Sequence, residues 1–338
     1  MKKAFTLLEV VFVIVIMAVL ALMSSDLLLN IYKNYIHSRS VNELEYKTDI
    51  ALEQIAKRLQ YRLKGSEIAR NLSSENAITD IKSGNYKSED RYALEWINMS
   101  YETQNIISTV DNISKMGWSG VTDITSFVTI GTDNKTTFFT PGSNLNPTGE
   151  NNSFTDTINS SYYKQNGVVE NGVKDFGIYF VNKNVADINN DFGYGTNHNK
   201  IAIANISSTD HITITVPTST TPLKTVDDFE VSDKYYLLNT AYAVVPLVKK
   251  DNAETRKQVA GNNINQDEVF DLWLHYNYRP WNGESFLANT TAKSLLAENV
   301  SLFRFTKTDN DMIVMKLCMR TLDTDEIDFT VCKTKAVY

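Results

Sequence analysis

The sequence predicts an α+β protein in which one long N-terminal helix packs against an antiparallel β-sheet head. No glycine or proline precedes Gly65, although the 338 residues include 14 glycines and 6 prolines. After residue 173, short runs of β-branched and aromatic residues alternate with Asn, Asp and Gly, a pattern typical of strands and turns. The helix is therefore expected first and the sheet second.

Composition limits the classes of function. The 33 Lys and Arg residues against 40 Asp and Glu residues give a net charge of −7, which argues against a surface that coats nucleic acid. No P-loop, nucleophile elbow or dinucleotide fingerprint occurs. The histidines lack the spacing of a metal site; they are His37, His198, His211 and His275. The sequence therefore predicts no enzyme, no catalytic residue and no cofactor.

The N-terminal segment is apolar over Phe5–Met23, apart from one acid, Glu9. As a helix, these residues would span about 28 Å, close to the ~30 Å hydrocarbon core of a membrane. Lys2 and Lys3 would then stay cytoplasmic, and the rest would be exported. A plain anchor or a secretory signal cleaved after Val19-Leu20-Ala21 are alternatives. Neither explains an acid that costs roughly 2.5–3.5 kcal/mol in a membrane unless it is paired.

The string Ala4-Phe5-Thr6-Leu7-Leu8-Glu9 resembles the prepilin processing motif of the type IV pilin superfamily. The resemblance implies that prepilin peptidase cleaves between Ala4 and Phe5, that Phe5 is N-methylated, and that Glu9 guides assembly. Cleavage would leave an ammonium on Phe5, which Glu9 of this or a neighbouring subunit can neutralise. The chain departs from the family at Ala4, where glycine is usual. It also has Asp26 where many major pilins have a helix-kinking proline.

The resemblance divides the chain into a leader (1–4), a membrane and filament-core helix half (5–25), an amphipathic helix half (26–64) and a periplasmic α+β head (65–338). Lys64 and Gly65 predict the end of the helix. A long coiled coil is an alternative, but the apolar stripe lasts only about three heptads. The stripe comprises Val41, Leu44, Thr48, Leu52, Ile55, Leu59 and Leu63, and the solvated face comprises Glu43, Lys47, Glu53, Lys57, Arg58 and Arg62.

The head is expected to be one domain, since no repeat or clear linker occurs. Residues 66–165 predict loops, short helices and one strand near Phe127–Ile130, and 131–165 and 187–199 predict surface loops. The later strands are predicted at Phe176–Val181, Ile201–Ile206, Ile212–Val216, Tyr235–Val248, Val269–Tyr278, Val300–Lys307 and Met312–Met319. The residues Thr308–Asp311 predict a hairpin between the last two. The tryptophans are expected in the core rather than on a binding surface; they are Trp96, Trp118, Trp273 and Trp281.

Cys318 and Cys332 are the only cysteines, and with an exported head they predict one disulfide; two free thiols are the alternative. The disulfide would tie a final strand, Phe329–Cys332, to the strand before it. Some pseudopilins use calcium to hold C-terminal loops, so the acidic residues inside this loop are candidate calcium ligands: Asp323, Asp325, Glu326 and Asp328. A solvated acidic hairpin is the alternative.

A second acidic segment, Asp187–Asp191, begins like an EF-hand loop. Phe192 stands where that loop needs glycine, and His198 stands where it needs its final glutamate. A polar turn therefore fits this segment better than a calcium site.

The expected function is that of a minor pilin or pseudopilin, at the priming or tip position of a type II secretion or type IV pilus-like filament. Expected partners are other pilins or pseudopilins, prepilin peptidase and an inner-membrane assembly platform, without direct nucleic-acid binding. The precursor would lie in the inner membrane with its head in the periplasm, and then in a periplasmic or surface filament. The head is large for a closely repeating subunit. A stand-alone membrane-anchored binding protein or adhesin is the alternative, for which Glu9 would be incidental.

Overall fold

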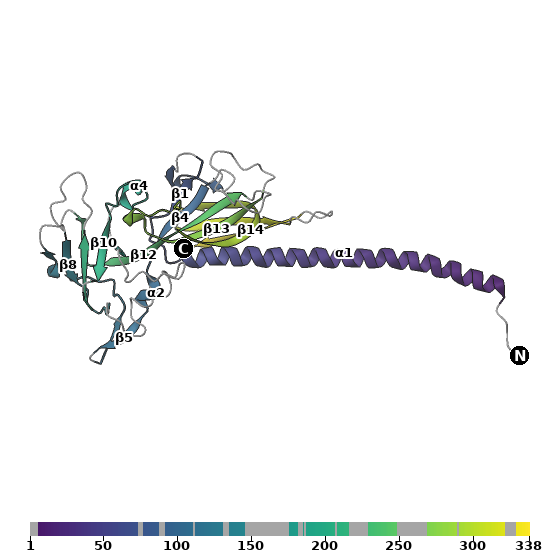
Figure 1. Ribbon diagram of the computed structural model, residues 1–338, viewed down its shortest axis with the longest axis horizontal. Helices are drawn as coiled ribbons and strands as arrows, with labels where there is room; N and C mark the ends of the chain where they lie inside the picture. The colour runs from purple at the N-terminus through teal and green to yellow at the C-terminus, as the bar shows by residue number, and fades with distance from the viewer. Residues whose placement is uncertain are drawn as a thin grey trace.

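One long helix, α1 (Leu7–Leu59), projects from a sheet-rich head (Figure 1). The computed structural model describes residues 6–73, 77–87, 92–110, 112–130, 135–145, 176–181, 185, 187–206, 208–215, 229–248, 269–288, 291–321 and 329–338. The helix passes through position 26 without a break, as expected for a segment without glycine or proline. The α+β architecture agrees with the prediction.

Fourteen of the described strands form one antiparallel sheet. Those nearer α1 are β1 (Ile68–Asn71), β2 (Ile78–Asp80), β3 (Tyr86–Lys87), β4 (Tyr92–Met99), β12 (Tyr235–Val248), β13 (Phe270–Tyr278), β14 (Ala292–Lys307), β15 (Ile313–Arg320) and β16 (Thr330–Val337). Those farther from it, called the distal part here, are β7 (Val128–Ile130), β8 (Lys135–Phe139), β9 (Phe176–Phe180), β10 (Ile201–Ile206) and β11 (His211–Thr215).

The remaining elements are short. A separate two-stranded ribbon consists of β5 (Ile107–Val110) and β6 (Ile113–Met116). The short helices are α2 (Tyr101–Gln104), α4 (Ile188–Asp191), and the 3-10 turns η1 (Ile81–Ser83), η2 (Ile124–Ser126) and η4 (Pro280–Asn282).

Strand β12 belongs to both parts of the sheet. One of its edges pairs with β13. On the other edge, Tyr235–Leu238 pairs with β9 and Leu238–Val244 pairs with β4. The near part therefore lies against α1, whereas the distal part lies beyond the C-terminal end of that helix (Figure 1).

The predicted apolar stripe attaches α1 to the near part of the sheet. Leu44, Leu52, Ile55 and Leu59 are buried in one hydrophobic cluster with side chains of β4, β12, β13, β14 and β15. Helical spacing places these residues on one face of α1. Alternate residues of the strands face a second cluster on the other side of the sheet, and a third cluster fills the distal part. The head is thus covered by α1 on one face only.

The helix ends at Leu59 and not at Lys64 as predicted. The backbone amide of Leu63 donates to the carbonyl of Ile97 over 2.8 Å, and the carbonyl of Tyr61 accepts from the amide of Met99 over 2.9 Å. These bonds draw the segment after α1 onto the edge of β4. A long-range pairing therefore competes successfully with the last helical turn.

The strands predicted beyond residue 173 are all present, and Ile201–Ile206 and Tyr235–Val248 match at both ends. Strand β14, however, begins at Ala292 and not at Val300 as predicted. The prediction of mainly loops over 66–165 was wrong for seven strands, β1 to β6 and β8, whereas the strand near Phe127–Ile130 is present as β7. Strand β4 is buried on both faces, so it lacks the polar alternation that marks a half-exposed strand. The surface-loop prediction for 187–199 was wrong at Phe192 and Tyr194, which are buried.

Candidate assembly interface

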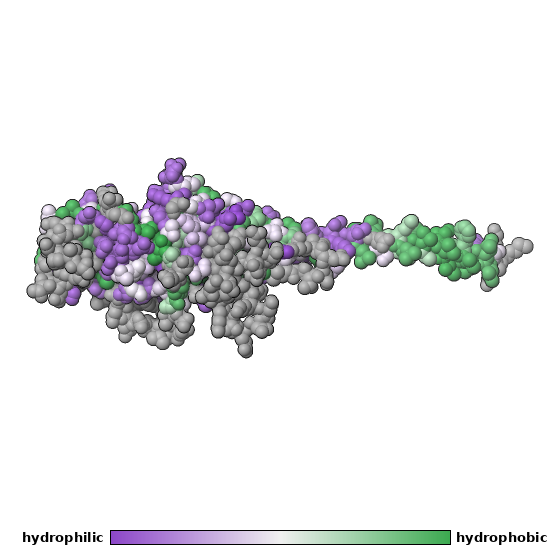
Figure 2. Space-filling model, turned by 90° about the horizontal axis from the view of Figure 1, so that it is seen from above, coloured by the Kyte–Doolittle hydropathy of each residue, from purple (hydrophilic) through white to green (hydrophobic). Residues whose placement is uncertain are grey.

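The N-terminal half of α1 is an exposed apolar rod. Large apolar side chains from Leu7 to Tyr35 face solvent, and Leu22, for example, is 71% exposed. Among the described residues of α1, none before Leu44 is buried. Figure 2 shows apolar surface along this free end and a more polar head. In the described part of the chain, α1 is the one helix that is long and apolar enough to cross a membrane.

Glu9 lies in the first turn of α1, where its amide donates to the carbonyl of Thr6 over 3.0 Å. Its side chain is exposed among the apolar side chains of Leu8, Val10 and Phe12. A negative charge is favourable at this end of a helix because the unpaired amides carry partial positive charge. Glu9 is therefore available to a cationic partner. Ala4 and Phe5 lie outside the described residues.

Ion pairs line the contact between α1 and the edge strand β16. Lys333 lies 3.5 Å from Glu45 and 4.0 Å from Asp49, and Lys335 pairs with Glu53. The hydrogen bond from Lys335 lowers the pKa of the Glu53 carboxyl. Such exposed pairs add little stability because water screens them. Their role in the fold is to fix the position of β16 along the helix.

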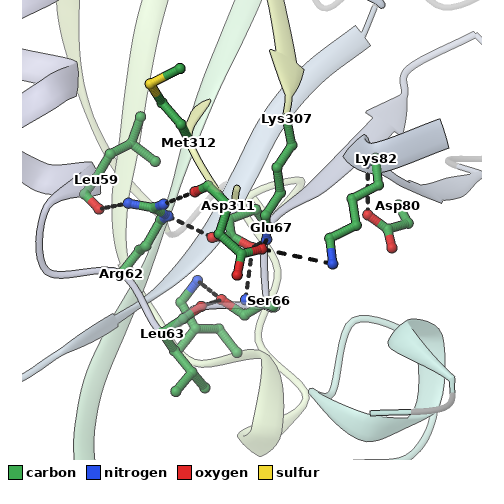
Figure 3. Close-up of polar contacts among 12 residues, drawn as sticks. Leu59, Arg62, Leu63, Ser66, Glu67, Asp80, Lys82, Lys307, Asp311 and Met312 are labelled. Atoms are coloured by element: carbon green, nitrogen blue, oxygen red, sulfur yellow. Dashed lines mark hydrogen bonds and ion pairs between the residues drawn. The ribbon is translucent and has the colours of Figure 1, made fainter. Parts of the chain in front are cut away.

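A buried charge cluster joins the end of α1 to the head (Figure 3). The Arg62 guanidinium donates to Glu67 over 2.5 Å, to the carbonyl of Leu59 over 2.8 Å and to the carbonyl of Asp311 over 2.7 Å. The second oxygen of Glu67 accepts from Lys307 over 2.9 Å. Arg62 thus donates a hydrogen bond to a carbonyl at the end of the helix that has no partner within the helix. It also links the helix end to the turn between β14 and β15.

The prediction that Arg62 lies on the solvated face of the helix was wrong, because its side chain is 1% exposed. The helix has already ended at this point, so helical spacing no longer sets the direction of the side chain. Arg62, Glu67 and Lys307 were not singled out from the sequence. The sequence feature that could have indicated them is an Arg and a Glu on either side of Gly65. In the structure, Gly65 has a φ of 92°, which allows the tight turn between the two side chains.

A second buried pair lies in the cluster on the face of the sheet away from α1. Arg70 donates to Glu95 over 2.7 Å, and the hydroxyl of Tyr278 donates to the other oxygen of Glu95 over 2.9 Å. Burial and the Glu95 charge raise the pKa of Tyr278 well above its ordinary value. These groups are closed off by packing, so they stabilise one arrangement of strands rather than form an open site.

One group of side chains resembles part of a catalytic triad. The Nδ1 atom of His211 lies 2.7 Å from Asp210 and 3.3 Å from the hydroxyl of Ser208. A triad needs the serine on the ring nitrogen opposite the one that faces the acid. Here Ser208 and Asp210 contact the same nitrogen, so the arrangement cannot pass a proton from serine through histidine.

The described residues include only one of the two acidic segments that are candidate calcium sites. The cluster Asp323, Asp325, Glu326 and Asp328 lies outside them. In the other segment, Asp187 accepts from the amide of Asn189 and so caps α4. No group of three His, Cys, Asp or Glu side chains in the described ranges is arranged to hold a metal ion.

Cys318 and Cys332 form a disulfide between β15 and β16, the pairing that the sequence predicts. They are direct partners in the strand register. Trp96, Trp118 and Trp281 are buried, as expected for core residues, whereas Trp273 is half-buried.

Residues 1–25 match a family model described as a prokaryotic N-terminal methylation motif. No match was found among the curated proteins or among the solved structures. The motif and the apolar helix indicate a type IV pilin-like or pseudopilin-like precursor that is processed at its N-terminus. They fit a membrane-anchored structural subunit that is processed by prepilin peptidase and assembles with other pilin subunits.

Proposed function

We propose that this chain is a minor pilin or pseudopilin at the priming or tip end of a type II secretion or type IV pilus-like filament. The leader, residues 1–4, is removed between Ala4 and Phe5, and Phe5 is then methylated. Residues 5–25 hold the precursor in the inner membrane with the head in the periplasm. The same helix half later enters the filament core.

The exposed apolar half of α1 is the observation that carries the proposal. Its large apolar side chains from Leu7 to Tyr35 are exposed in the described part of the chain. A surface of this length is stable only in lipid or against other apolar helices. A pilin-like subunit uses both environments in turn, first as a precursor and then as part of a filament.

Glu9 supplies the specificity of that packing. Cleavage before Phe5 creates an ammonium close to Glu9 in sequence, and an unpaired charge in an apolar environment is costly. Pairing between the ammonium of one subunit and Glu9 of another favours one axial register over its neighbours. The helices are thereby prevented from sliding freely along their apolar faces.

The shape of the head supports a position that is not repeated along the shaft. The distal part of the sheet and the β5–β6 ribbon lie past the C-terminal end of α1 (Figure 1). In a filament built on parallel helices, that space is needed for subunits farther along the axis. Such a head is easier to place near an end than at every step of the shaft.

Mass spectrometry of the membrane-extracted protein tests the first step. The expected N-terminal peptide starts at Phe5 and carries one methyl group. A peptide that starts at Met1, or directly after Ala21, contradicts the proposal. Co-purification tests the second step, which is assembly with other subunits that carry the N-terminal methylation motif. The alternative, a stand-alone anchored binding protein or adhesin, would be purified without them.

A further inference from the structure

A groove lies between α1 and the N-terminal half of β14. Its volume is about 250 Å³. Leu44, Ala297 and Met319, each less than a tenth exposed, are among its lining residues. Leu295, 39% exposed, also lines it. Because a dry cavity of about 150 Å³ holds a benzene molecule, the groove has room for at least one large apolar side chain.

The course of β14 shapes this groove. Between Ala297 and Val300, β14 has one residue more than the facing segment of β13, and Asn299 has a φ of 57°. Such a bulge bends a strand and changes the direction of its side chains. The opposite wall is one stretch of α1 with Leu44, Lys47 and Ile50. Lys47 and Glu298 add charged groups to a largely apolar lining, the composition of a protein interface.

A lipid chain is a poor occupant because the groove stands far from the membrane. Leu44 follows the expected membrane segment, residues 5–25, by a length of helix that corresponds to about 28 Å. A partner must therefore present its own apolar side chain at this height. One wall of the groove is α1 itself, so a helix that runs alongside α1 reaches it directly.

We propose that the groove binds an apolar side chain from the N-terminal helix of a neighbouring pilin-type subunit. This inference rests on the proposed function, and it identifies the partner surface and the direction of packing. Between Tyr35 and the groove, the apolar residues Ile36 and Val41 of α1 remain partly exposed. The groove is therefore an extension of the helix-packing surface onto the head.

The height of the groove sets the stagger between subunits. A neighbour displaced toward the tip by about 14–26 Å brings its positions corresponding to Leu27–Tyr35 level with Leu44, because each helical residue rises 1.5 Å. In this chain these positions include the apolar residues Leu27, Leu28, Leu29 and Ile31, which follow the membrane segment. The contact is heterologous, because it joins two different surfaces of the subunits. The displacement places the subunit that donates the side chain nearer the tip than this subunit. Of the two positions proposed above, the inference therefore favours a priming position beneath at least one other subunit over the outermost tip.

Photocrosslinking in cells that make the complete filament tests the inference. The residue p-benzoylphenylalanine replaces Leu295 in the full chain, and a second variant carries it at Leu22. A third carries it at Ile107, which is more exposed than Leu295, at 73% against 39%, but lies on β5. The expected Leu295 product joins a peptide from the first 45 or so residues of a motif-bearing subunit, whereas Ile107 gives no such product.

The outcomes separate the two proposals. Crosslinking from Leu22 to a partner helix without a helix product from Leu295 overturns the groove inference and leaves the proposed function standing. A Leu295 product with a partner's head also overturns it. If neither position yields a pilin-type partner, the proposed function itself fails.

A substitution provides a second measurement. Leu295→Asp should lower the amount of this subunit recovered with its partners by about tenfold, the effect of one lost contact in a buried pocket. The matched variant Ile107→Asp should leave recovery unchanged. Thermal unfolding of both variants confirms that each head is folded, and equal recovery of the two contradicts the inference.

Discussion

Arg62 and Glu67 form an ion pair of 2.5 Å at the point where the helix leaves the sheet, and both side chains are almost wholly buried. Arg62 also holds carbonyls of Leu59 and Asp311, whereas Glu67 also holds Lys307. The pair therefore connects the helix to the far end of the sequence.

Replacement of Glu67 should destabilise the protein severely. Glu67→Gln leaves Arg62 and Lys307 buried without their shared anion, which costs about 3–5 kcal/mol in comparable buried pairs. Chemical unfolding of the detergent-solubilised chain measures the loss. Glu43→Gln is the matched control, because Glu43 pairs with Lys47 on the exposed face of α1 and should change little. Equal stability of the two variants would refute a structural role for the cluster.

Glu9 should matter for assembly and not for cleavage. Glu9→Val removes the only acid near the new N-terminus while it preserves the apolar helix. We expect the leader to be removed as in the wild type and incorporation into the filament to fall strongly. Immunoblots of membrane and sheared-filament fractions measure the two steps separately. Normal incorporation of the variant would contradict the charge-pairing role of Glu9.

The disulfide should stabilise the hairpin of β15 and β16. Its cysteines are separated by 14 positions, so its removal should cost on the order of 3 kcal/mol in the chain-entropy model. The variant with both Cys318→Ala and Cys332→Ala should therefore unfold at a lower denaturant concentration. Added reductant should shift the wild type in the same direction and leave the double variant unaffected. A wild type indifferent to reductant would count against this contribution.

His275 should make the head less stable in mild acid. Burial, together with the charge of Lys293 on the adjacent strand, lowers the pKa of His275 to about 4. The unfolded chain binds this proton below about pH 6.5, but the folded chain does not until about pH 4. The contribution of His275 to the free energy of unfolding is therefore complete above pH 6.5 and is lost as the pH falls from 6.5 to 4. The loss reaches roughly 3 kcal/mol.

Unfolding free energies measured across that pH range test the prediction. His275→Phe removes the titrating group beside Phe286, so its stability should fall less than that of the wild type. His37→Phe, at an exposed position on α1, should retain the dependence of the wild type. Parallel curves for the wild type and His275→Phe would exclude His275 as the cause.

Two glycines should respond differently to alanine. A Cβ atom at Gly117 would lie 1.8 Å from the carbonyl oxygen of Thr103, so the backbone must move. The expected cost is at least about 1–3 kcal/mol. Gly65 has no atom within 4 Å of an added Cβ, and its cost comes from a φ of 92° alone, about 1–2 kcal/mol. Thermal unfolding should therefore rank Gly117→Ala below Gly65→Ala, and the reverse order would contradict this explanation.

Local sequence signals determined the helix, its apolar half and the methylation motif. They also determined the strands after residue 173, because helical periodicity and β-branched runs are properties of neighbouring residues. The motif identified Glu9, which stands alone among apolar neighbours. The cysteine pair was predictable because the chain has only two.

The tertiary structure alone decided where α1 ends, which polar residues are buried and how the sheet is divided. β4 pairs with β12 across more than a hundred residues, for example at Leu94 and Val244, and no local pattern predicts that partner. Strand β4 also forms hydrogen bonds with Tyr61 and Leu63, which draw this segment off the helix and bring Arg62 to Glu67 and Lys307. The groove beside Leu44 likewise exists only after β14 and α1 meet. Long-range contacts overrode local propensity at these points because burial and paired charges outweigh the free energy of one helical turn.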